Sequence, residues 1–301
     1  MYYYRAFGLF FETDIEFQTL EKMAADECRS NKVTIRAAQM PKSVVDTGDG
    51  GYRIGETYSF FHNRTMMMEI KNGTEIGYQL KAGGNPEYMK SYILGYGITM
   101  LCLQRKIITL HCSAVEHNGS AVLISGKSGS GKSTLTARLL SREYGFLADD
   151  IAAVVPDEQK VLVYPTFPYQ KLCRDAALAQ GYDLEQMSYI DEEKDKFLVS
   201  MEKQYIDYPV PVKAMVYLYT HDGESMECKK LEGMDKFGCI ASNQFLQNLL
   251  GKDIFLPYIG QECLRIASKV DVYLIGRPLQ GEAGEEIADF ISRLVTIQNP
   301  I

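Results

Sequence analysis

The fold is decided by residues 110–155, which read LHCSAVEHNGSAVLISGKSGSGKSTLTARLLSREYGFLADDIAAVV. Residues 126–133 of this stretch match the pattern GxxxxGKS, in which glycines let backbone N–H groups converge on an anionic phosphate. The apolar run at 121–124 is typical of a buried strand, and Leu135 and Leu139 recur at helical spacing after the pattern. A strand, a glycine-rich loop and a helix therefore follow one another in the order that a phosphate-binding loop requires.

We expect this loop, together with the threonine that follows it, to surround the phosphates of a nucleotide. Lys132 is predicted to reach the outer phosphates, and the Ser133 hydroxyl is predicted to bind magnesium. The helix after the loop would add its positive N-terminal end to the site. The predicted phosphate-binding residues are Gly126, Lys127, Ser128, Gly129, Ser130, Gly131, Lys132, Ser133 and Thr134.

A hairpin signal precedes the loop. The dipeptide Asn118-Gly119 lies between two strand-like runs and is the strongest short-range indication of a two-residue turn. If these residues form the turn, each step back along the first strand matches one step forward along the second, and His111 lies opposite Gly126. The sequence therefore predicts an imidazole at the mouth of the loop. The alternative is a purely structural histidine, which is the commoner role of an isolated one.

Two acidic residues follow the next short strand. The apolar run at 146–148 ends in Asp149 and Asp150. Ligands of open α/β sheets bind outside the carboxyl ends of the strands, so these carboxylates are expected where magnesium and a phosphoryl acceptor would meet. The alternative is a surface turn with two solvated carboxylates. The neighbouring phosphate loop favours the first interpretation.

Composition narrows the class of protein. The chain has 301 residues, a hydrophobic fraction of 46% and a net charge of −7, without blocks of like charge. This pattern indicates a globular protein and argues against a nucleic-acid partner, because such proteins carry a basic patch. The seven cysteines lack metal-type spacing, and no apolar stretch is long enough to span a membrane. The N-terminus lacks the basic region of a secretory signal, so we expect a cytoplasmic protein with reduced thiols.

The chain is predicted to contain two parts. Residues 1–85 consist of short β-type runs separated by turn signals, and the sequence GGNP at 83–86 marks a boundary. We therefore expect a β-rich N-terminal domain at 1–85, which would bind an acceptor or partner, and an α/β domain with a mixed sheet at 86–301. The expected helices are at 88–105, 169–179, 234–250, 256–268 and 282–294, a charged loop lies at 184–196, and strands lie at 161–164, 214–220, 226–231 and 270–275.

Four features in a fixed register resemble the HPr kinase/phosphorylase superfamily, whose kinase core is similar to phosphoenolpyruvate carboxykinase. They are the histidine of Leu110-His111, the strand hairpin, the loop from Gly126 and the run Ala148-Asp149-Asp150. The likeness is specific over residues 108–155. It implies a P-loop core of the HPr-kinase and PEP-carboxykinase type with a mixed sheet, and the β-rich N-terminal region is more similar to divergent members such as lasso-peptide kinases.

The resemblance also implies roles for these residues. Asp149 would accept the proton of the acceptor hydroxyl, and His111 would lie next to Asp149 and tune it. Lys132 would contact the phosphates of ATP, while Ser133 and Asp150 would hold Mg²⁺. The sequence departs from HPr kinases in two ways: Thr134 replaces an acidic residue, and the Glu-Ile-Arg-Gly signature has no counterpart. We therefore expect the kinase reaction and not the reverse phosphorolysis. We also do not expect HPr itself to be the acceptor.

Proteins with a phosphate-binding loop of this kind include three functional classes to compare with this sequence. The leading hypothesis is an ATP-dependent kinase that phosphorylates a serine-type hydroxyl of a peptide, small protein or small molecule. The alternative is a nucleotide-gated binding module or slow ATPase that grips a partner through its N-terminal domain. Decarboxylation of the carboxykinase type would need more metal ligands and carboxylate-binding arginines than the sequence offers.

Partners are less defined by the sequence. We expect a nucleoside triphosphate and a hydroxyl-bearing acceptor, with no nucleic acid and no membrane. The resembled family includes hexamers. No sequence feature specifies a subunit interface, so the sequence allows an oligomer without predicting one. Four basic residues follow the predicted catalytic stretch, namely Lys171, Arg174, Lys194 and Lys196. Each would contact phosphates or an acidic acceptor, and a solvated surface position is an equal alternative for each.

Overall fold

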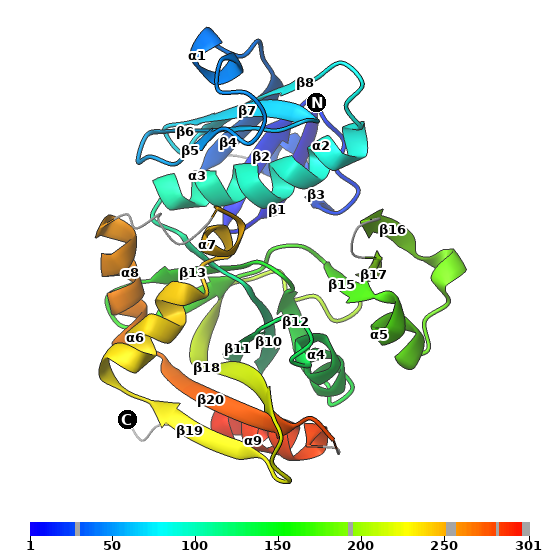
Figure 1. Ribbon diagram of the computed structural model, residues 1–301, viewed down its shortest axis with the longest axis vertical. Coiled ribbons are helices and arrows are strands. Elements are labelled where there is room, and N and C mark those ends of the chain that lie inside the picture. Colours follow the sequence, from blue (N-terminus) through cyan, green and yellow to red (C-terminus); the bar gives the residue numbers. More distant parts are fainter. Residues whose placement is uncertain (28–30, 192–194, 251–256, 281–282, 297–301) are drawn as a thin grey trace. The chain divides into compact units, whose positions relative to one another are not determined.

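The computed structural model describes residues 1–27, 31–191, 195–250, 257–280 and 283–296, which form a mixed α/β protein with mixed sheets (Figure 1). The chain separates into two compact units. The first unit contains Met1–Thr109 and Gln244–Gly260, and the second contains Leu110–Asn243 and Gln261–Ile301. In the ranges given above, no helix has the length and apolar character needed to cross a membrane.

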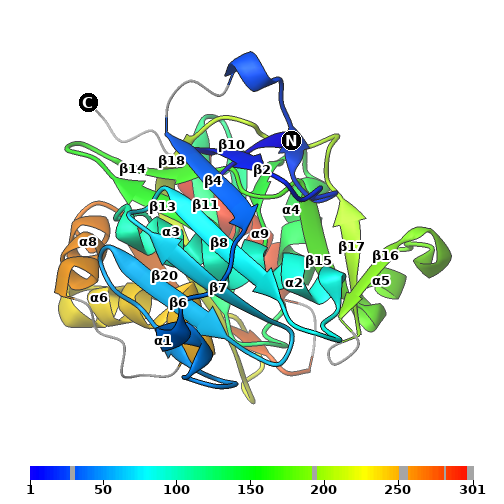
Figure 2. The same ribbon diagram turned by 90° about the horizontal axis from the view of Figure 1, so that it is seen from above.

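The first unit is built on an eight-stranded sheet in the order β3-β1-β2-β4-β8-β7-β6-β5. Figure 2 looks onto this sheet, with β4, β8, β7 and β6 side by side. The β2–β4 and β4–β8 pairs are parallel, and the remaining pairs are antiparallel. The strands are β1 (Tyr2–Ala6), β2 (Leu9–Thr13), β3 (Glu21–Lys22), β4 (Lys32–Ala37), β5 (Tyr52–Arg53), β6 (Tyr58–His62), β7 (Met66–Lys71) and β8 (Glu75–Leu80).

One continuous helical segment packs on this sheet. It consists of α2 (Pro86–Tyr92), the π-helical η2 (Ile93–Gly97) and α3 (Ile98–Gln104). The Asn85 side chain accepts a hydrogen bond of 2.8 Å from the backbone N–H of Glu87 and so caps the N-terminus. The shorter elements of this unit are η1 (Ala25–Glu27), α1 (Lys42–Val45) and α7 (Phe245–Leu250).

The division of the chain differs from the boundary expected at 85/86. The helix predicted at 88–105 is present, but it packs against β7 and β8 and therefore belongs to the first unit. The units consequently separate between Thr109 and Leu110, within strand β9 (Ile108–Leu110). Residues 244–260 return to the first unit, and their α7 contacts α3. Sequence signals for turns do not reveal which of two sheets a helix will cover.

The second unit contains the central sheet, whose strands run in the order β12-β10-β11-β18-β14-β13. β20 lies beside β18, and β19 lies beside β20. The β11–β18 and β18–β20 pairs are parallel, whereas β10 is antiparallel to both β11 and β12. The strands are β10 (Cys112–His117), β11 (Ser120–Gly126), β12 (Gly145–Ala148), β13 (Ala152–Pro156), β14 (Val161–Tyr164), β18 (Val210–His221), β19 (Glu227–Leu231) and β20 (Asp271–Pro278).

The β10–β11 hairpin confirms the register predicted from its turn. His117 pairs with Ser120, and the pairing continues to Cys112 opposite Ser125. Asn118 and Gly119 both have positive φ, at 52° and 74°, as a two-residue hairpin turn of this kind requires. His111 consequently follows directly on the last pair before the loop.

Helices α4 (Lys132–Leu140) and α9 (Gly284–Thr296) contact each other and share a core with the central strands. Leu139, Val216 and Ile275 are completely buried in that core. Two further helices are α6 (Gly233–Ser242) and α8 (Pro257–Ala267). The expected helix at 234–250 is thus two helices, because Asn243 ends α6 and its side chain donates back to Cys239 O at 2.6 Å. The starting residues of the other two expected helices, Leu256 and Glu282, lie outside the described residues.

A small three-stranded sheet forms a separate group in Figure 1, in the order β15-β17-β16. Its elements are β15 (Tyr169–Cys173), α5 (Arg174–Ala179), η3 (Leu184–Gln186), β16 (Ser188–Asp191) and β17 (Lys196–Ser200). The prediction of one helix over 169–179 is wrong for its first half, because residues 169–173 pair with β17. The loop expected at 184–196 likewise contains η3 and β16, and its residues 192–194 lie outside the described residues.

Candidate functional site

The candidate site lies at one edge of the central sheet. Both β11 and β12 are antiparallel to β10, and β18 and β20 are parallel to β11 and to each other, so these four strands end at the same edge. β11 ends in the segment 126–131, which we call the glycine loop. β12 is followed by Asp149 and Asp150, and β20 carries Arg277 next to its end. Chemical groups from three strands are therefore collected where α/β sheets bind their ligands.

The glycine loop joins β11 to α4 (Figure 1). Gly126, Gly129 and Gly131 all have positive φ, at 143°, 80° and 99°. At Gly126 a glycine is also required by space, because a Cβ there would lie 2.4 Å from Leu218 O and 2.6 Å from Ser130 Oγ. The positions predicted for phosphate binding thus form a tight turn that leads directly into a helix N-terminus. Lys127, Ser128 and Thr134 are exposed, whereas Ser130 is buried.

Lys132 is folded back over the loop. Its Nζ donates to Gly126 O at 2.6 Å and to Lys127 O at 3.2 Å. The backbone N–H of Ser130 donates to Lys127 O at 3.1 Å, which closes the turn. The ammonium group therefore lies within the loop, and the half-buried Ser133 follows it in the first turn of α4.

Arg277 contacts the same loop and was not predicted from the sequence. Its Nε donates to Ser130 O at 2.8 Å, and its Nη2 donates to Gly129 O at 3.1 Å. The residue is separated from the loop by almost half the chain, so no local motif links the two. The one available signal was its place just beyond the strand expected at 270–275, at the edge where parallel strands end.

Asp149 is buried with both carboxylate oxygens hydrogen-bonded. Ser113 Oγ donates to Oδ1 at 2.6 Å, and the backbone N–H of Lys171 donates to Oδ2 at 2.9 Å. Burial raises the pKa of the Asp149 carboxyl above its ordinary value, and the neighbouring charge of Asp150 raises it further. The two hydrogen bonds and the charge of Lys171 lower the pKa and offset part of this effect. Ser113 is a small polar residue inside a buried strand, and no sequence pattern marks it as a partner of Asp149.

The raised pKa of Asp149 predicts a stability gain in the Asp149→Asn variant. A carboxyl whose folded-state pKa lies above its unfolded value loses stability as the pH rises through that window, and the loss persists at higher pH. Asn fits the same contacts, because its oxygen accepts from Lys171 and its amide donates to the Ser113 hydroxyl. We expect the variant to melt a few degrees higher than the native protein at pH 8, with a smaller difference at pH 4. Thermal melts at the two pH values measure this, and a lower melting temperature at pH 8 would contradict the prediction.

Asp150 joins a histidine and a lysine. Its φ of 68° is left-handed, and its carboxylate lies 2.8 Å from Lys171 Nζ and 3.4 Å from His111 Nδ1. His111 Nδ1 also lies 3.0 Å from the backbone carbonyl of Asp150. The resemblance implied that His111 would lie next to Asp149 and tune it. In the structure the imidazole contacts the adjacent residue, Asp150. The left-handed turn presents both the carbonyl and the carboxylate of Asp150 to the ring.

The backbone of His111 is fixed independently of its ring. Its N–H donates to Asn243 O at 2.7 Å, and its carbonyl oxygen lies 2.9 Å from Ser125 Oγ. Ser125 is the residue of β11 directly before the loop, so the histidine is tied to the loop strand. This agrees with the predicted position of His111 near the mouth of the loop.

A metal ion would find few protein ligands here. Among the residues that the structure describes, no group of three or more His, Cys, Asp or Glu side chains is arranged to hold one. The oxygens predicted to bind Mg²⁺ are the Asp150 carboxylate and the Ser133 hydroxyl. Two protein oxygens would suffice for Mg²⁺ bound together with a nucleotide, because Mg²⁺ in such sites is held by one or two protein oxygens plus phosphates and water.

The four basic residues predicted as possible ligands differ in their contacts. Lys171 contacts Asp149 through its backbone N–H and Asp150 through its ammonium group. Arg174 forms an ion pair with Asp195 at 2.6 Å, and its guanidinium lies 5.0 Å from the centre of the Phe197 ring. Lys194 lies outside the described residues, and so does the side chain of Lys196.

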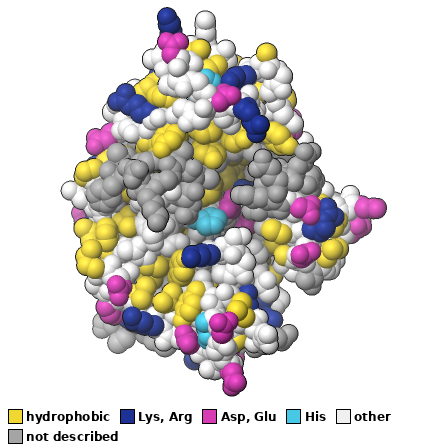
Figure 3. Space-filling view, in the orientation of Figure 1, with side chains coloured by type: hydrophobic (Ala, Val, Ile, Leu, Met, Phe, Trp, Pro, Cys, Tyr) yellow, Lys and Arg dark blue, Asp and Glu magenta, His cyan; other side chains and the backbone are white. Residues whose placement is uncertain are grey.

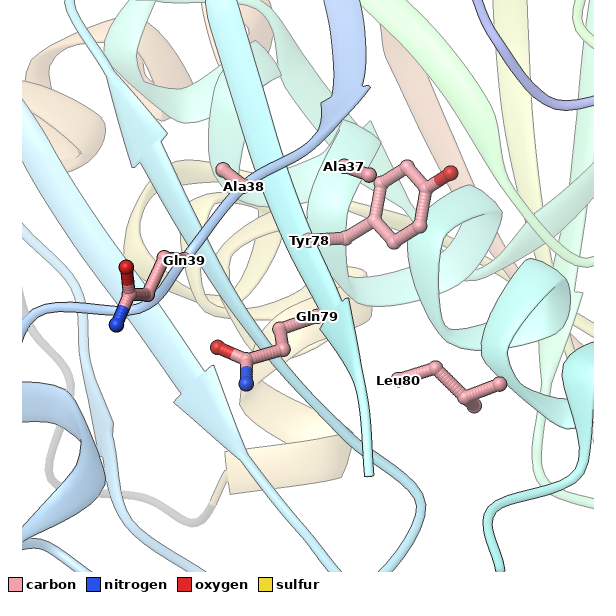
Figure 4. Close-up of a pocket in the computed structure, with 6 residues that line it drawn as sticks. All are labelled: Ala37, Ala38, Gln39, Tyr78, Gln79 and Leu80. Atoms are coloured by element: carbon pink, nitrogen blue, oxygen red, sulfur yellow. The ribbon is translucent and has the colours of Figure 1, made fainter. Parts of the chain in front are cut away.

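The first unit has an open hollow of its own, shown in Figure 4. It lies at the ends of β4 and β8, and two of its polar side chains already have structural partners. The Tyr78 hydroxyl donates to Asp14 at 2.9 Å, and the Gln79 side-chain oxygen accepts from Met40 N at 2.8 Å. The lining residues are Ala37, Ala38, Gln39, Tyr78, Gln79 and Leu80. None of these lining residues is acidic or basic, in contrast to the residues at the edge of the central sheet.

Surface charge agrees with the composition. On the face drawn in Figure 3, Lys and Arg side chains are interspersed with Asp and Glu side chains.

Comparisons with known proteins give matches among solved structures. No family model matches the chain, and no curated protein matches it. Among solved structures, the chain is similar to the Hpr(Ser) kinase/phosphatase from Coxiella burnetii, with 13% sequence identity and a TM-score of 0.31. The match covers 62% of this chain and 93% of that one. Similarity at this level carries no conclusion about function, which has to be argued from the site.

Proposed function

We propose that this chain is an ATP-dependent phosphotransferase that transfers the γ-phosphoryl group to a serine-type hydroxyl of a peptide, small protein or small molecule. The observation that supports it is the meeting, at one sheet edge, of the glycine loop and the pair Asp149-Asp150. Phosphoryl transfer needs a phosphate cradle, charge neutralisation and a group that accepts the hydroxyl proton. The candidate site offers a residue for each.

The glycine loop and α4 supply the donor side. Backbone N–H groups and the helix N-terminus would bind the phosphates, since both favour anions. Lys132 would exchange its bonds to Gly126 O and Lys127 O for bonds to the outer phosphates. Ser133 and Asp150 would hold Mg²⁺, which neutralises phosphate charge when bound. Lys171 and His111 would then orient Asp150, which both of them contact.

Asp149 would act on the acceptor side. The hydroxyl oxygen attacks the γ-phosphorus, the bond from that phosphorus to the bridging oxygen breaks, ADP leaves, and the hydroxyl proton passes to the Asp149 carboxylate. A carboxylate has about four acceptor positions, so the bonds from Ser113 and Lys171 leave room for this proton. A raised pKa makes the carboxylate a stronger base than an ordinary aspartate at neutral pH.

Replacing Lys132 tests the donor side. Lys132→Met removes the ammonium while keeping the apolar stem, and we expect transfer to fall about a hundredfold because a phosphate charge loses its partner. The matched control is Lys160→Met, which removes an exposed lysine of the same unit that lies in a β-turn away from the loop. Initial rates of ADP formation and the dissociation constant of Mg-ATP check the prediction. Equal rates in the two variants would remove Lys132 from the site.

A further inference from the structure

We infer that Arg277 holds the glycine loop in its phosphate-binding shape from the carbonyl side, and does so whether or not a nucleotide is bound. The inference rests on the proposed function and adds to it a positioning residue that acts through the loop backbone. Arg277 is suited to this role because a guanidinium is always charged and its donors lie in a rigid plane.

The contacts of Arg277 fix two successive peptide groups. Nε donates to Ser130 O and Nη2 to Gly129 O, at 2.8 and 3.1 Å. Because a trans peptide is planar, its N–H points away from its carbonyl oxygen. Turning these two carbonyls toward Arg277 therefore turns the N–H groups of Ser130 and Gly131 away from it. The Ser130 N–H donates across the turn to Lys127 O, in agreement with this orientation.

Gly131 permits the close approach of the guanidinium. A Cβ at this position would lie 3.1 Å from Arg277 Nε, and the φ of 99° is one that side-chain-bearing residues rarely adopt. The glycine therefore serves both the turn and the contact with Arg277.

The strand that carries Arg277 is anchored in the core. Arg277 pairs with Thr220 of β18, and β18 pairs with β11 up to Gly126 opposite Leu218. Ile275, two residues earlier on the same face of β20, is completely buried. The guanidinium is thus held by the same sheet that holds the first residue of the loop.

Nucleotide binding would change the contacts of Lys132 but not those of Arg277. Lys132 has to give up two loop carbonyls to reach a phosphate, whereas Arg277 keeps its two carbonyls. A loop that is already ordered before binding costs less conformational entropy when the ligand arrives. Arg277 therefore maintains the loop during the exchange made by Lys132.

The test compares a nucleotide with a polyphosphate that lacks the nucleoside. Dissociation constants of Mg-ATP and of magnesium tripolyphosphate are measured by calorimetry for the native protein, Arg277→Gln and Arg277→Lys. We expect Arg277→Gln to bind both ligands more weakly by the same factor, about tenfold, and Arg277→Lys to fall between because it keeps the charge without the fork. Amide hydrogen exchange over residues 127–132, without ligand, should be faster in Arg277→Gln.

The control is Arg142→Gln. Arg142 forms ion pairs with Glu285 and Asp289 rather than with the loop, so its loss reports the effect of removing a cation from the same unit. Native affinity for both ligands in Arg277→Gln would overturn the inference, and so would a loss confined to ATP, which would indicate a contact with the nucleoside. If Arg277→Gln does not fold, Arg277→Lys decides, and native affinity in that variant overturns the inference. Absence of binding by the native protein would contradict the proposed function itself.

Discussion

Asp149→Asn is expected to lower phosphoryl transfer by about 10²- to 10⁴-fold, the range that general-base catalysis contributes. Asn keeps the size and the hydrogen-bonding shape of the side chain, but it cannot accept the proton of an attacking hydroxyl. The dissociation constant of Mg-ATP should stay within a few fold of the native value, because the donor side consists of the glycine loop and α4. Rates of transfer and equilibrium binding are measured on the same preparations.

Asp157→Asn is the matched control for this substitution. Asp157 belongs to the same unit but accepts hydrogen bonds from the backbone of Gln159 and Lys160 in an exposed turn. We expect this variant to transfer at the native rate. Unchanged transfer in Asp149→Asn would remove the carboxylate from the reaction, and a parallel loss of ATP affinity would place it on the donor side instead.

Gly126→Ala is expected to be the most destabilising single substitution in the loop. Its Cβ would meet a backbone oxygen of β18, Leu218 O, at 2.4 Å, and a backbone atom inside a sheet cannot move aside cheaply. The φ of 143° adds strain for any residue with a side chain. We expect a loss of about 3 kcal/mol or more in the free energy of unfolding, as in other substitutions that force atoms into a packed core.

The hairpin turn provides the control for Gly126. Gly119 also has a positive φ, of 74°, but a Cβ there would meet nothing within 4 Å. Gly119→Ala should therefore cost only the backbone strain, about 1 kcal/mol. Urea denaturation of both variants separates the two effects. Equal losses would show that the space behind Gly126 is not the limiting factor.

Local features of the site were predictable from the sequence. The turn at Asn118-Gly119 sets the hairpin register by itself, and the strand, glycines and helix around Lys132 follow from short-range patterns. The position of Asp149 at a strand end followed from the apolar run before it. These predictions depend on residues close in the chain, whose geometry is set by turn chemistry and periodicity.

The long-range contacts were not predictable. Lys171 donates its backbone N–H to Asp149 and pairs its ammonium with Asp150, but it does so from a strand that was predicted to be a helix. Sheet pairing with β17 overrides the local pattern there. Arg277 reaches the loop because β18 lies between β11 and β20, and that order is a property of the whole sheet.

The measurement that tests the central claim most directly is the fate of the γ-phosphate. The native protein is incubated with γ-labelled ATP, Mg²⁺ and pooled hydroxyl acceptors, namely serine-containing peptides and small alcohols. The label is then partitioned between phosphate monoesters and inorganic phosphate. The proposed function predicts labelled monoesters that disappear in Asp149→Asn. Label found in inorganic phosphate alone, to the same extent in both proteins, would contradict it and favour a slow ATPase or a nucleotide-gated binding module.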